Sequence, residues 1–236
     1  MSDQTDASSP RPLPSSSPAS RREFLATAAA MGPLLVSPRV ARGSQANSRV
    51  TLGLIGCGGR GTFVADHFRK HGGYEVRAAV DYFQDRVDAF GDEHQVPADR
   101  RHTGLDGYRR VLEDDVDAVV IESPPWFHPV QASDAVKAGK HVYLAKPVAV
   151  DVPGCRTVEA SGRRATESEK CFLVDFQTRT DPLYKEAVKR AQYGDIGRIV
   201  CGEATYICGP TWGEQAKWLE ETPDDPEMRL RAWGLD

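Results

Sequence analysis

The stretch that most constrains this chain runs from Val50 to Gly61 and reads V-T-L-G-L-I-G-C-G-G-R-G. Its first half, 50–55, is apolar enough for a buried strand. Gly56, Gly58 and Gly61 then have the spacing G-x-G-x-x-G, and a helix-like pattern follows. A strand, a glycine turn and a helix in this order predict a dinucleotide-binding βαβ unit, because the glycines allow a tight turn, a close approach to pyrophosphate and close packing of helix on strand.

We expect the whole turn to hold the phosphates of the cofactor, against the positive end of the following helix. The residues of the turn are Gly56, Cys57, Gly58, Gly59, Arg60 and Gly61. Cys57 stands where any small residue would fit, so its thiol is given no chemistry.

An acidic residue at the end of the second predicted strand strengthens this prediction. The strand, 75–80, is followed by Asp81, and Asp81 comes twenty residues after Gly61. A carboxylate there can accept hydrogen bonds from both hydroxyls of an adenosine ribose and would repel a 2′-phosphate. We therefore expect NAD, with NADP as an alternative because Arg60 could meet a phosphate. The structural alternative is an ordinary glycine turn with a solvated aspartate.

Composition excludes several other classes of protein. The 236 residues carry a net charge of −4 with no long basic run beyond the N-terminal part, which argues against nucleic acid as a partner. No apolar run is long enough to span a bilayer. The cysteines lack C-x-x-C spacing, so we expect no metal site. Cys201 and Cys208 could form a disulfide, but we expect them to be small buried residues in strands.

Residues 1–46 are typical of a targeting segment. Residues 1–19 are rich in Ser and Pro and should be disordered. S-R-R-E-F-L at 20–25, the weakly apolar run 26–36 and the small residues after it look like a twin-arginine signal. We therefore expect export of the folded protein to the periplasm. The alternative is a disordered basic tail on a cytoplasmic protein.

The rest of the chain up to residue 176 alternates predicted strands and helices. We expect strands at 101–104, 116–121, 141–144 and 171–176, and helices at 86–95, 108–112, 130–138 and 151–168. This order predicts an α/β fold with a doubly wound parallel sheet, a Rossmann fold. The glycine turn, Asp81, 123–128 and 146–147 all follow strands, so they should gather at the carboxyl edge of the sheet, where such folds bind ligands.

Two further motifs make the resemblance specific. S-P-P-W-F-H at 123–128 and A-G-K-H-V-Y-L-A-K-P at 138–147, together with the glycine turn and Asp81, look like the glucose-fructose oxidoreductase and inositol dehydrogenase family, Gfo/Idh/MocA. The likeness covers about residues 49–210. It implies a nicotinamide cofactor, hydride transfer and a sugar or polyol-like substrate.

The resemblance also assigns roles to residues at the two strand ends. Lys146 matches the family lysine that lies near the nicotinamide and the substrate, and is our candidate for proton transfer. Pro147 matches the proline that shapes the turn. The residues that match the cofactor-lining loop are Ser123, Pro124 and His128.

Each of these assignments has a simpler alternative. Lys146 could be a solvated surface lysine, and His128 a helix-start histidine satisfied by backbone. Trp126 and Phe127 could pack the loop or form a platform for the nicotinamide. Two residues depart from the family pattern. Ala145 replaces the family glutamate before the lysine, and Pro125 stands where the family often has Asp or Asn.

We expect residues 177–236 to be the start of an incomplete α+β substrate domain, after a dinucleotide-binding domain at 47–176. Asp181 and Pro182 predict a helix start, Gly194 its end, and 198–208 a strand. The resemblance implies that this domain forms a large sheet and the subunit interface, so a homo-oligomer is expected. The family histidine toward the middle of that domain has no counterpart, since the last histidine here is His141.

Two functions remain open on the sequence. The first is an NAD(P)-dependent oxidoreductase of the Gfo/Idh/MocA type, acting as the intact gene product on a sugar or polyol-like substrate. The second is a non-catalytic dinucleotide-binding protein or a truncated remnant without a substrate pocket, which Ala145 and the short second domain favour. We expect no turnover from these 236 residues alone.

Overall fold

The computed structural model describes residues 49–205, and beyond them residues 207, 217, 220, 221, 224–227 and 231. Contacts divide the chain into two units, 1–47 and 48–236. The first unit, which holds the predicted targeting segment, lies outside the described residues. In the part that is described, no helix is both long and apolar enough to cross a membrane.

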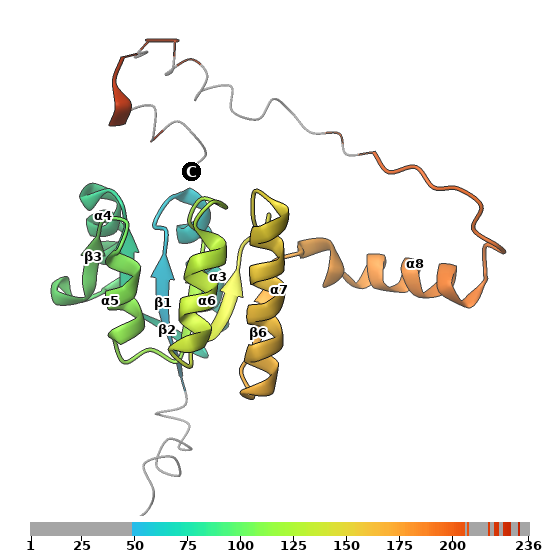
Figure 1. The fold of residues 1–236 in the computed structure, drawn as a ribbon, viewed down its shortest axis with the longest axis horizontal. Helices are drawn as coiled ribbons and strands as arrows, with labels where there is room; N and C mark the ends of the chain where they lie inside the picture. Colours follow the sequence, from blue (N-terminus) through green and yellow to red (C-terminus); the bar gives the residue numbers. More distant parts are fainter. Residues whose placement is uncertain are drawn as a thin grey trace, which may run out of the picture. The chain divides into compact units, whose positions relative to one another are not determined.

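Strands and helices alternate along the second unit (Figure 1). The strands are β1 (Val50–Ile55), β2 (Tyr74–Asp81), β3 (Arg101–Thr103), β4 (Ala118–Ile121), β5 (His141–Leu144) and β6 (Phe172–Val174). The helices are α3 (Gly59–His71), α4 (Gln84–His94), α5 (Gly107–Glu113), α6 (His128–Lys137), α7 (Val152–Glu167) and α8 (Pro182–Tyr193), with short 3₁₀ turns η2 (Ala98–Arg100) and η3 (Gln177–Arg179).

The strands form one six-stranded sheet in the order β3-β2-β1-β4-β5-β6. All five neighbouring pairs are parallel. The order reverses between β1 and β4, which start the two halves of the sheet. This is the order of a dinucleotide-binding Rossmann fold, and it confirms the predicted fold class. The reversal also fixes where a ligand would lie, in the crevice beyond the carboxyl ends of β1 and β4.

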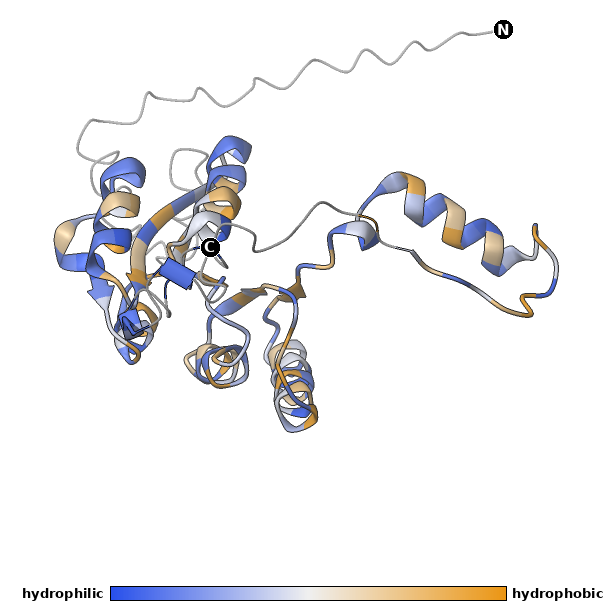
Figure 2. Cartoon of the chain, turned by 90° about the horizontal axis from the view of Figure 1, so that it is seen from above, coloured by the Kyte–Doolittle hydropathy of each residue, from blue (hydrophilic) through white to orange (hydrophobic). Residues whose placement is uncertain are grey.

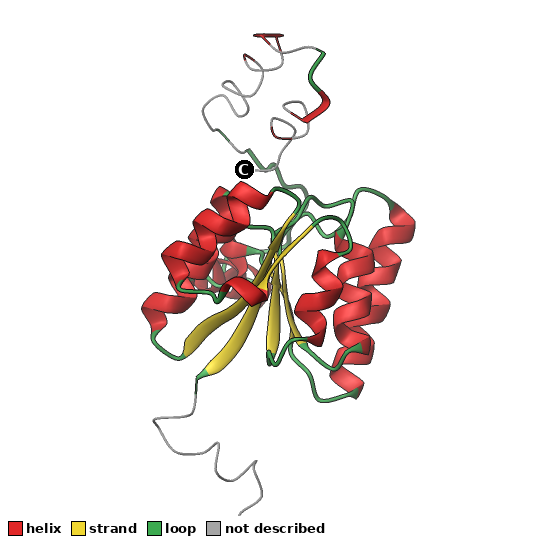
Figure 3. Cartoon of the chain, turned by 90° about the vertical axis from the view of Figure 1, so that its left-hand side faces the viewer, coloured by secondary structure: helices red, strands yellow, loops and turns green. Residues whose placement is uncertain are grey.

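Helices cover both faces of the sheet, as the edge-on view in Figure 3 shows. On one face, α5, α6 and α7 pack on residues that include Ile55, Val119 and Leu144. On the other face, α3 and α4 pack on residues that include Leu54 and Val120. Because every central strand is covered on both faces, the strands are almost continuously apolar.

The predicted strand at 116–121 is shorter than expected and begins at Ala118. Asp117, just before it, accepts hydrogen bonds from the backbone N–H (2.9 Å) and the hydroxyl (2.7 Å) of Thr51. In return the hydroxyl of Thr51 accepts the N–H of Asp117 at 2.9 Å. These side-chain bonds, together with a backbone bond from the N–H of Asp117 to the carbonyl oxygen of Thr51 at 2.9 Å, hold the entry of β4 beside the start of β1.

The predicted strand at 198–208 is wrong over the described residues, 198–205 and 207, none of which is in a strand. Its apolar side chains are exposed, with Val200 81% and Ile207 93% accessible. The physical reason is that a strand needs a neighbour to take its backbone hydrogen bonds. Cys201 is exposed and free, which corrects the expectation that it is buried in a strand. Cys208 lies outside the described residues.

Helix α8 begins as predicted, with the Asp181 carboxylate accepting the backbone N–H of Leu183 at 2.8 Å, and it ends at Gly194. Figure 2 shows that α8 carries hydrophobic and hydrophilic residues along its length. No residue of α8 is buried. Among the described residues of 177–236, none belongs to either core cluster. The core therefore consists of residues before 177.

Candidate functional site

The glycine turn brings three backbone segments into contact at the carboxyl end of β1. Gly56 has φ +100°, and a Cβ on it would lie 2.8 Å from the backbone of Glu122. A Cβ on Gly61 would lie 1.9 Å from the carbonyl oxygen of Gly56. The turn is therefore closed by contacts that only glycine allows.

Helix α3 starts within this turn, at Gly59. Its N-cap is Gly58, and no side chain caps it. The N–H groups of its first turn thus have no side-chain acceptor, and they form the positive end of the helix dipole. A pyrophosphate fits this cradle, both in shape and in charge.

The Asp81 carboxylate lies next to the turn, at the end of β2. Its Oδ2 accepts the backbone N–H of Cys57 at 2.8 Å, and its Oδ1 accepts the N–H of Phe83 at 3.0 Å. Asp81 therefore ties the glycine turn to the loop after β2. Each carboxylate oxygen can accept a second hydrogen bond, so the group can still receive the hydroxyls of a ribose.

A cavity of about 350 Å³ lies at this edge of the sheet. Its lining comes from the ends of β1, β2 and β4, the loop after β3, and helices α4, α5 and α6. The lining residues are Ile55, Gly56, Gly58, Val80, Asp81, Tyr82, Phe83, Arg86, Gly104, Leu105, Tyr108, Glu122, Ser123, Pro124, Phe127 and Gln131. The cavity size and its mostly apolar walls are typical of a small-molecule or cofactor site.

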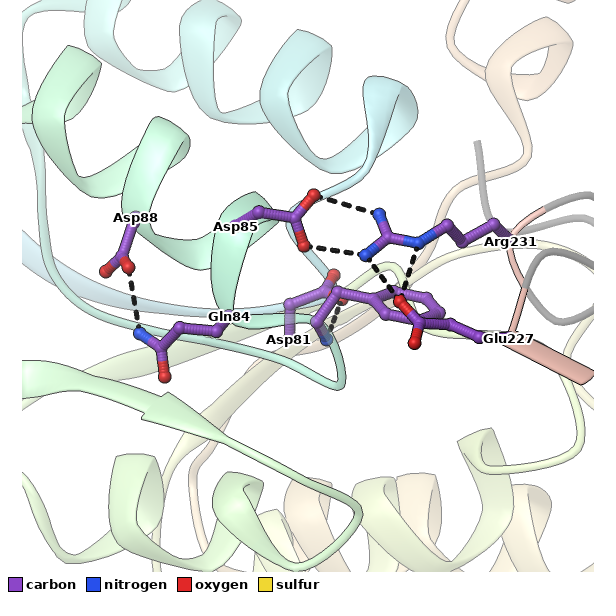
Figure 4. A network of polar contacts seen from close by, with 7 residues as sticks. Asp81, Gln84, Asp85, Asp88, Glu227 and Arg231 are labelled. Atoms are coloured by element: carbon purple, nitrogen blue, oxygen red, sulfur yellow. Dashed lines mark hydrogen bonds and ion pairs between the residues drawn. The ribbon is translucent and has the colours of Figure 1, made fainter.

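An arginine from the C-terminal part lies at the Asp81 end of this site (Figure 4). The Arg231 guanidinium donates to both carboxylate oxygens of Asp85, at 2.9 and 2.8 Å, and to Glu227. It also lies 4.0 Å from the centre of the Phe83 ring, which lines the cavity. Hydrogen bonds to Asp85 and Glu227 raise the pKa of Arg231. The charge of Arg231 is thus paired with Asp85 and Glu227.

Glu122, directly after β4, is the buried acid of the cavity. Its side chain is 1% exposed, and its Oε2 lies 3.9 Å from the Nε of Arg60. Its Oε1 is buried without a hydrogen-bond partner among the described residues. Burial raises the pKa of Glu122 to about 7, and the Asp175 carboxylate adds to the rise, whereas Arg60 and Lys146 oppose it.

Arg60 does not line the cavity. Its guanidinium pairs with Asp175, which follows β6. With Asp175 it lines a second hollow of about 490 Å³ beside α3. The position of Arg60 therefore does not support the expectation that it meets a phosphate, because its guanidinium already forms an ion pair with Asp175.

His128 is the first residue of α6 and is 1% exposed. Its Nδ1 lies 2.9 Å from the carbonyl oxygen of Pro147, and its Nε2 lies 2.7 Å from that of Ser123. Burial lowers the pKa of His128, whereas the hydrogen bonds to the two carbonyl oxygens raise it, because the ring donates from both nitrogens only when it is protonated. The ring thus ties together the loops after β4 and β5. This matches the structural alternative for His128, a histidine satisfied by backbone.

Replacing His128 with Phe should lower the free energy of unfolding by about 2 to 4 kcal/mol, because buried carbonyl oxygens would lose their donor. Urea unfolding with an unchanged m-value measures this loss. His71→Phe, at an exposed position on α3, is the control and should change stability by less than about 0.5 kcal/mol. Equal stability of the two variants would contradict the structural role of His128.

Lys146 and Pro147 follow β5 and are both exposed, and the peptide bond between them is cis. Ala145, before them, is buried, and its N–H donates to the carbonyl oxygen of Ile121 at 2.9 Å. The ends of β4 and β5 therefore lie side by side, with Glu122 next to Ala145. Lys146 is close enough to favour the ionised form of Glu122.

The structure brings together only part of the predicted site. Gly56, Gly58, Asp81, Ser123 and Pro124 line the cavity. The other predicted residues are not among those that line it: Cys57, Gly59, Arg60, Gly61, His128, Lys146 and Pro147. Of the two aromatic residues left open, Phe127 lines the cavity and Trp126 is 69% exposed.

Sequence reasoning missed Glu122, Phe83 and Gln131. Gln131 is buried on α6, and its side-chain oxygen accepts the hydroxyl of Ser123 at 2.5 Å. A signal for Glu122 was present, since a charged residue directly after a buried parallel strand lies at the ligand edge of the sheet. Nothing in the sequence distinguished Gln131 from an ordinary surface residue of α6.

A group of possible metal ligands, Asp66, Glu93 and His94, lies away from the cavity on α3 and α4. Asp66 already accepts the guanidinium of Arg69 at 2.7 Å. We therefore assign no metal to this group.

The comparisons with known proteins agree with this geometry. The model of the Gfo/Idh/MocA oxidoreductase family, with an NAD-binding Rossmann fold, matches residues 50–176. An α-N-acetylgalactosaminidase of Shewanella oneidensis is 29% identical in an alignment of 220 positions that covers 81% of this chain and 47% of that protein. The chain thus spans about half the length of the curated relatives it matches.

Solved structures show the same fold. The scyllo-inositol dehydrogenase from Lactobacillus casei, with bound NAD(H) and scyllo-inositol, has a TM-score of 0.54 and 26% identity, over 63% of this chain and 42% of that one. The myo-inositol 2-dehydrogenase from Lactobacillus plantarum has a TM-score of 0.55 and 25% identity, over 64% of this chain and 43% of that one.

Proposed function

The chain belongs to the Gfo/Idh/MocA oxidoreductase family with its NAD-binding Rossmann fold. From this premise we propose that it binds NAD(H) and transfers hydride to or from a sugar or polyol-like substrate. The observation that carries the proposal is that Gly56 and Asp81 line the same cavity. The glycine cradle suits a pyrophosphate, and the carboxylate suits the hydroxyls of a ribose. The inositol dehydrogenases with this fold support the substrate class.

The residues of this chain have separate tasks in that reaction. The nicotinamide supplies the hydride chemistry when it is bound. The first turn of α3 holds the pyrophosphate, and Asp81 holds the ribose. Ser123, Pro124 and Phe127 form the wall beyond β4. Lys146, exposed at the end of β5, is the candidate to take the proton of the substrate hydroxyl.

The full-length product of the gene, incubated with NAD⁺ and a panel of sugars and polyols, should accumulate NADH with at least one of them. The change in NADH absorbance measures this directly. Lys146→Met should lose turnover and keep its NADH affinity, since the lysine lies outside the cavity lining. Turnover that survives in Lys146→Met would contradict the role of Lys146.

A second candidate activity is glycoside cleavage, which the name of the Shewanella oneidensis relative favours. The same panel with an aryl glycoside added separates the two activities. A dehydrogenase accumulates one NADH for each product, whereas a glycosidase releases the sugar from an aryl glycoside without accumulating NADH. A third candidate, dinucleotide binding without catalysis, is favoured by Ala145 and predicts NADH binding with neither product.

We also propose that the protein is exported folded to the periplasm through the twin-arginine pattern at 20–25. Replacement of both Arg21 and Arg22 by Lys should keep the protein in the cytoplasm. Cell fractionation measures this, and export of the variant at the wild-type level would contradict the proposal.

A further inference from the structure

Glu122 has features that NAD(H) binding does not by itself explain, and the role inferred for this residue rests on the proposed function. The residue lines the cavity directly after β4, although its side chain is 1% exposed. Its Oε1 has no hydrogen-bond partner among the described residues. A buried carboxyl oxygen without a partner is costly, so natural proteins keep one mostly where a ligand or a function uses it.

The charges around Glu122 leave it without a full ion pair. Four groups from three directions face it: Arg60 from α3, Tyr143 and Lys146 from β5 and the turn after it, and Asp175 from the end of β6. Arg60 is the nearest cation, but its guanidinium pairs with Asp175, and its Nε is 3.9 Å from Glu122. Lys146 is exposed to solvent. The carboxyl group of Glu122 therefore has both its neutral and its charged form accessible near neutral pH.

The sheet order places Glu122 on the nicotinamide side of the cofactor. Asp81 ends β2, in the half of the sheet formed by β1, β2 and β3, and it suits the adenosine ribose. In a fold with this strand order the two halves each bind one mononucleotide, across the crevice between β1 and β4. The second nucleotide thus belongs to the half formed by β4, β5 and β6. Glu122 is the first residue after β4, beside Ala145 at the end of β5.

We propose that Glu122 makes the site distinguish the oxidised from the reduced cofactor: its carboxylate favours the positively charged nicotinamide of NAD⁺, and binding of NAD⁺ releases the Glu122 proton to solvent. NADH carries the same adenosine, riboses and pyrophosphate, but its nicotinamide ring is neutral. The two ligands therefore differ at the nicotinamide ring, which is charged and aromatic in NAD⁺ and neutral and non-aromatic in NADH. A low-dielectric cavity strengthens the attraction between the ring and the carboxylate.

The pH dependence follows from the protonation of the free site. The pKa of Glu122 is raised to about 7, mainly by burial, so below pH 7 the carboxyl is mostly neutral. A bound cation lowers that pKa. NAD⁺ must then displace a proton at pH 6, whereas at pH 8 the carboxylate is already formed. The NAD⁺ affinity should therefore rise as the pH increases to about 7 and level off above it, by up to about tenfold for each unit by which the pKa falls.

Isothermal titration calorimetry of the full chain with NAD⁺ and with NADH, from pH 6 to pH 8, tests this directly. Two buffers of different ionisation enthalpy at pH 6.5 report the protons released. We expect the NAD⁺ affinity to increase several-fold over this range with release of a fraction of a proton, and the NADH affinity to change much less. Glu122→Gln keeps the shape of the side chain and should remove the difference. Glu113→Gln, exposed at the end of α5, is the matched control and should behave as wild type.

The outcomes separate this inference from the proposed function. No binding of either nucleotide by the folded chain overturns both. Binding of NAD⁺ and NADH with the same pH dependence, or a Glu122→Gln variant that keeps the difference, overturns the role of Glu122 and leaves the cofactor site in place. If Glu122→Gln does not fold, the wild-type titrations decide alone, because equal proton release with both ligands contradicts the inference.

Discussion

Gly61→Ala should abolish NADH binding and lower the free energy of unfolding by at least about 3 kcal/mol. The added Cβ would lie 1.9 Å from the carbonyl oxygen of Gly56, which is backbone and cannot rotate away. Gly56 has little room to move, since its N–H donates to the carbonyl oxygen of Val80 at 2.8 Å and a Cβ on it would lie 2.8 Å from the backbone of Glu122. The first turn of α3 would therefore have to shift away from β1, and the phosphate cradle would shift with it. Urea unfolding and an NADH fluorescence titration measure the two effects.

Gly59 offers a matched control within the same turn. A Cβ on Gly59 meets nothing within 4 Å, and the residue is the first of α3. Gly59→Ala should leave stability unchanged or raise it by up to about 1 kcal/mol, because alanine loses less backbone entropy in a helix. If Gly61→Ala were as stable as Gly59→Ala, the close packing of α3 on β1 would be wrong.

Asp81→Ala should weaken NADH binding at least about tenfold, since hydrogen bonds to a charged group each contribute about 1.5 to 3 kcal/mol. The same change should raise the affinity for NADPH relative to NADH, because the carboxylate that repels a 2′-phosphate is gone. Part of the NADH loss will come from the loop, since the N–H groups of Cys57 and Phe83 also lose their acceptor. Fluorescence titrations with both nucleotides measure the two affinities.

The ratio of the two affinities separates recognition from loop damage. Loop damage weakens both nucleotides alike, whereas loss of ribose recognition changes their ratio. Asp99→Ala, exposed in the turn before β3, is the control and should leave both affinities unchanged. An unchanged ratio in Asp81→Ala would mean that Asp81 is only a structural link between two loops.

Most of the sheet could be predicted because parallel strands that are covered on both faces appear in the sequence as nearly continuous apolar runs. Val50–Ile55 and His141–Leu144 have the predicted bounds. The predicted starts of α4, α5 and α6 differ from the observed ones by one or two residues, and no side-chain hydrogen bond caps these helices. The start of α7 is predicted to within one residue, and Asp151 caps it by accepting the N–H of Gly154 at 2.7 Å. The strand at 198–208 failed because periodicity shows that a segment can be a strand but does not show what it pairs with.

The site could be predicted only where the motif itself forms it. The glycine turn and Asp81 follow from spacing along the chain. The Arg60–Asp175 ion pair joins residues 115 positions apart, so no local pattern could show that Arg60 turns away from the cavity. The importance of Glu122 likewise depends on Arg60, Lys146 and Asp175, which meet only when β4, β5 and β6 lie side by side and α3 packs on the sheet. Long-range charge pairing is the part of the site that the sequence does not reveal.

An NADH titration of the full chain, followed by fluorescence and checked by circular dichroism for a folded α/β protein, tests the central claim most directly. We predict saturable binding of one NADH per chain, which NAD⁺ displaces and which is weakened in Asp81→Ala. A folded chain that shows no saturable NADH binding would contradict the assignment of the cavity between Gly56 and Asp81 as the cofactor site.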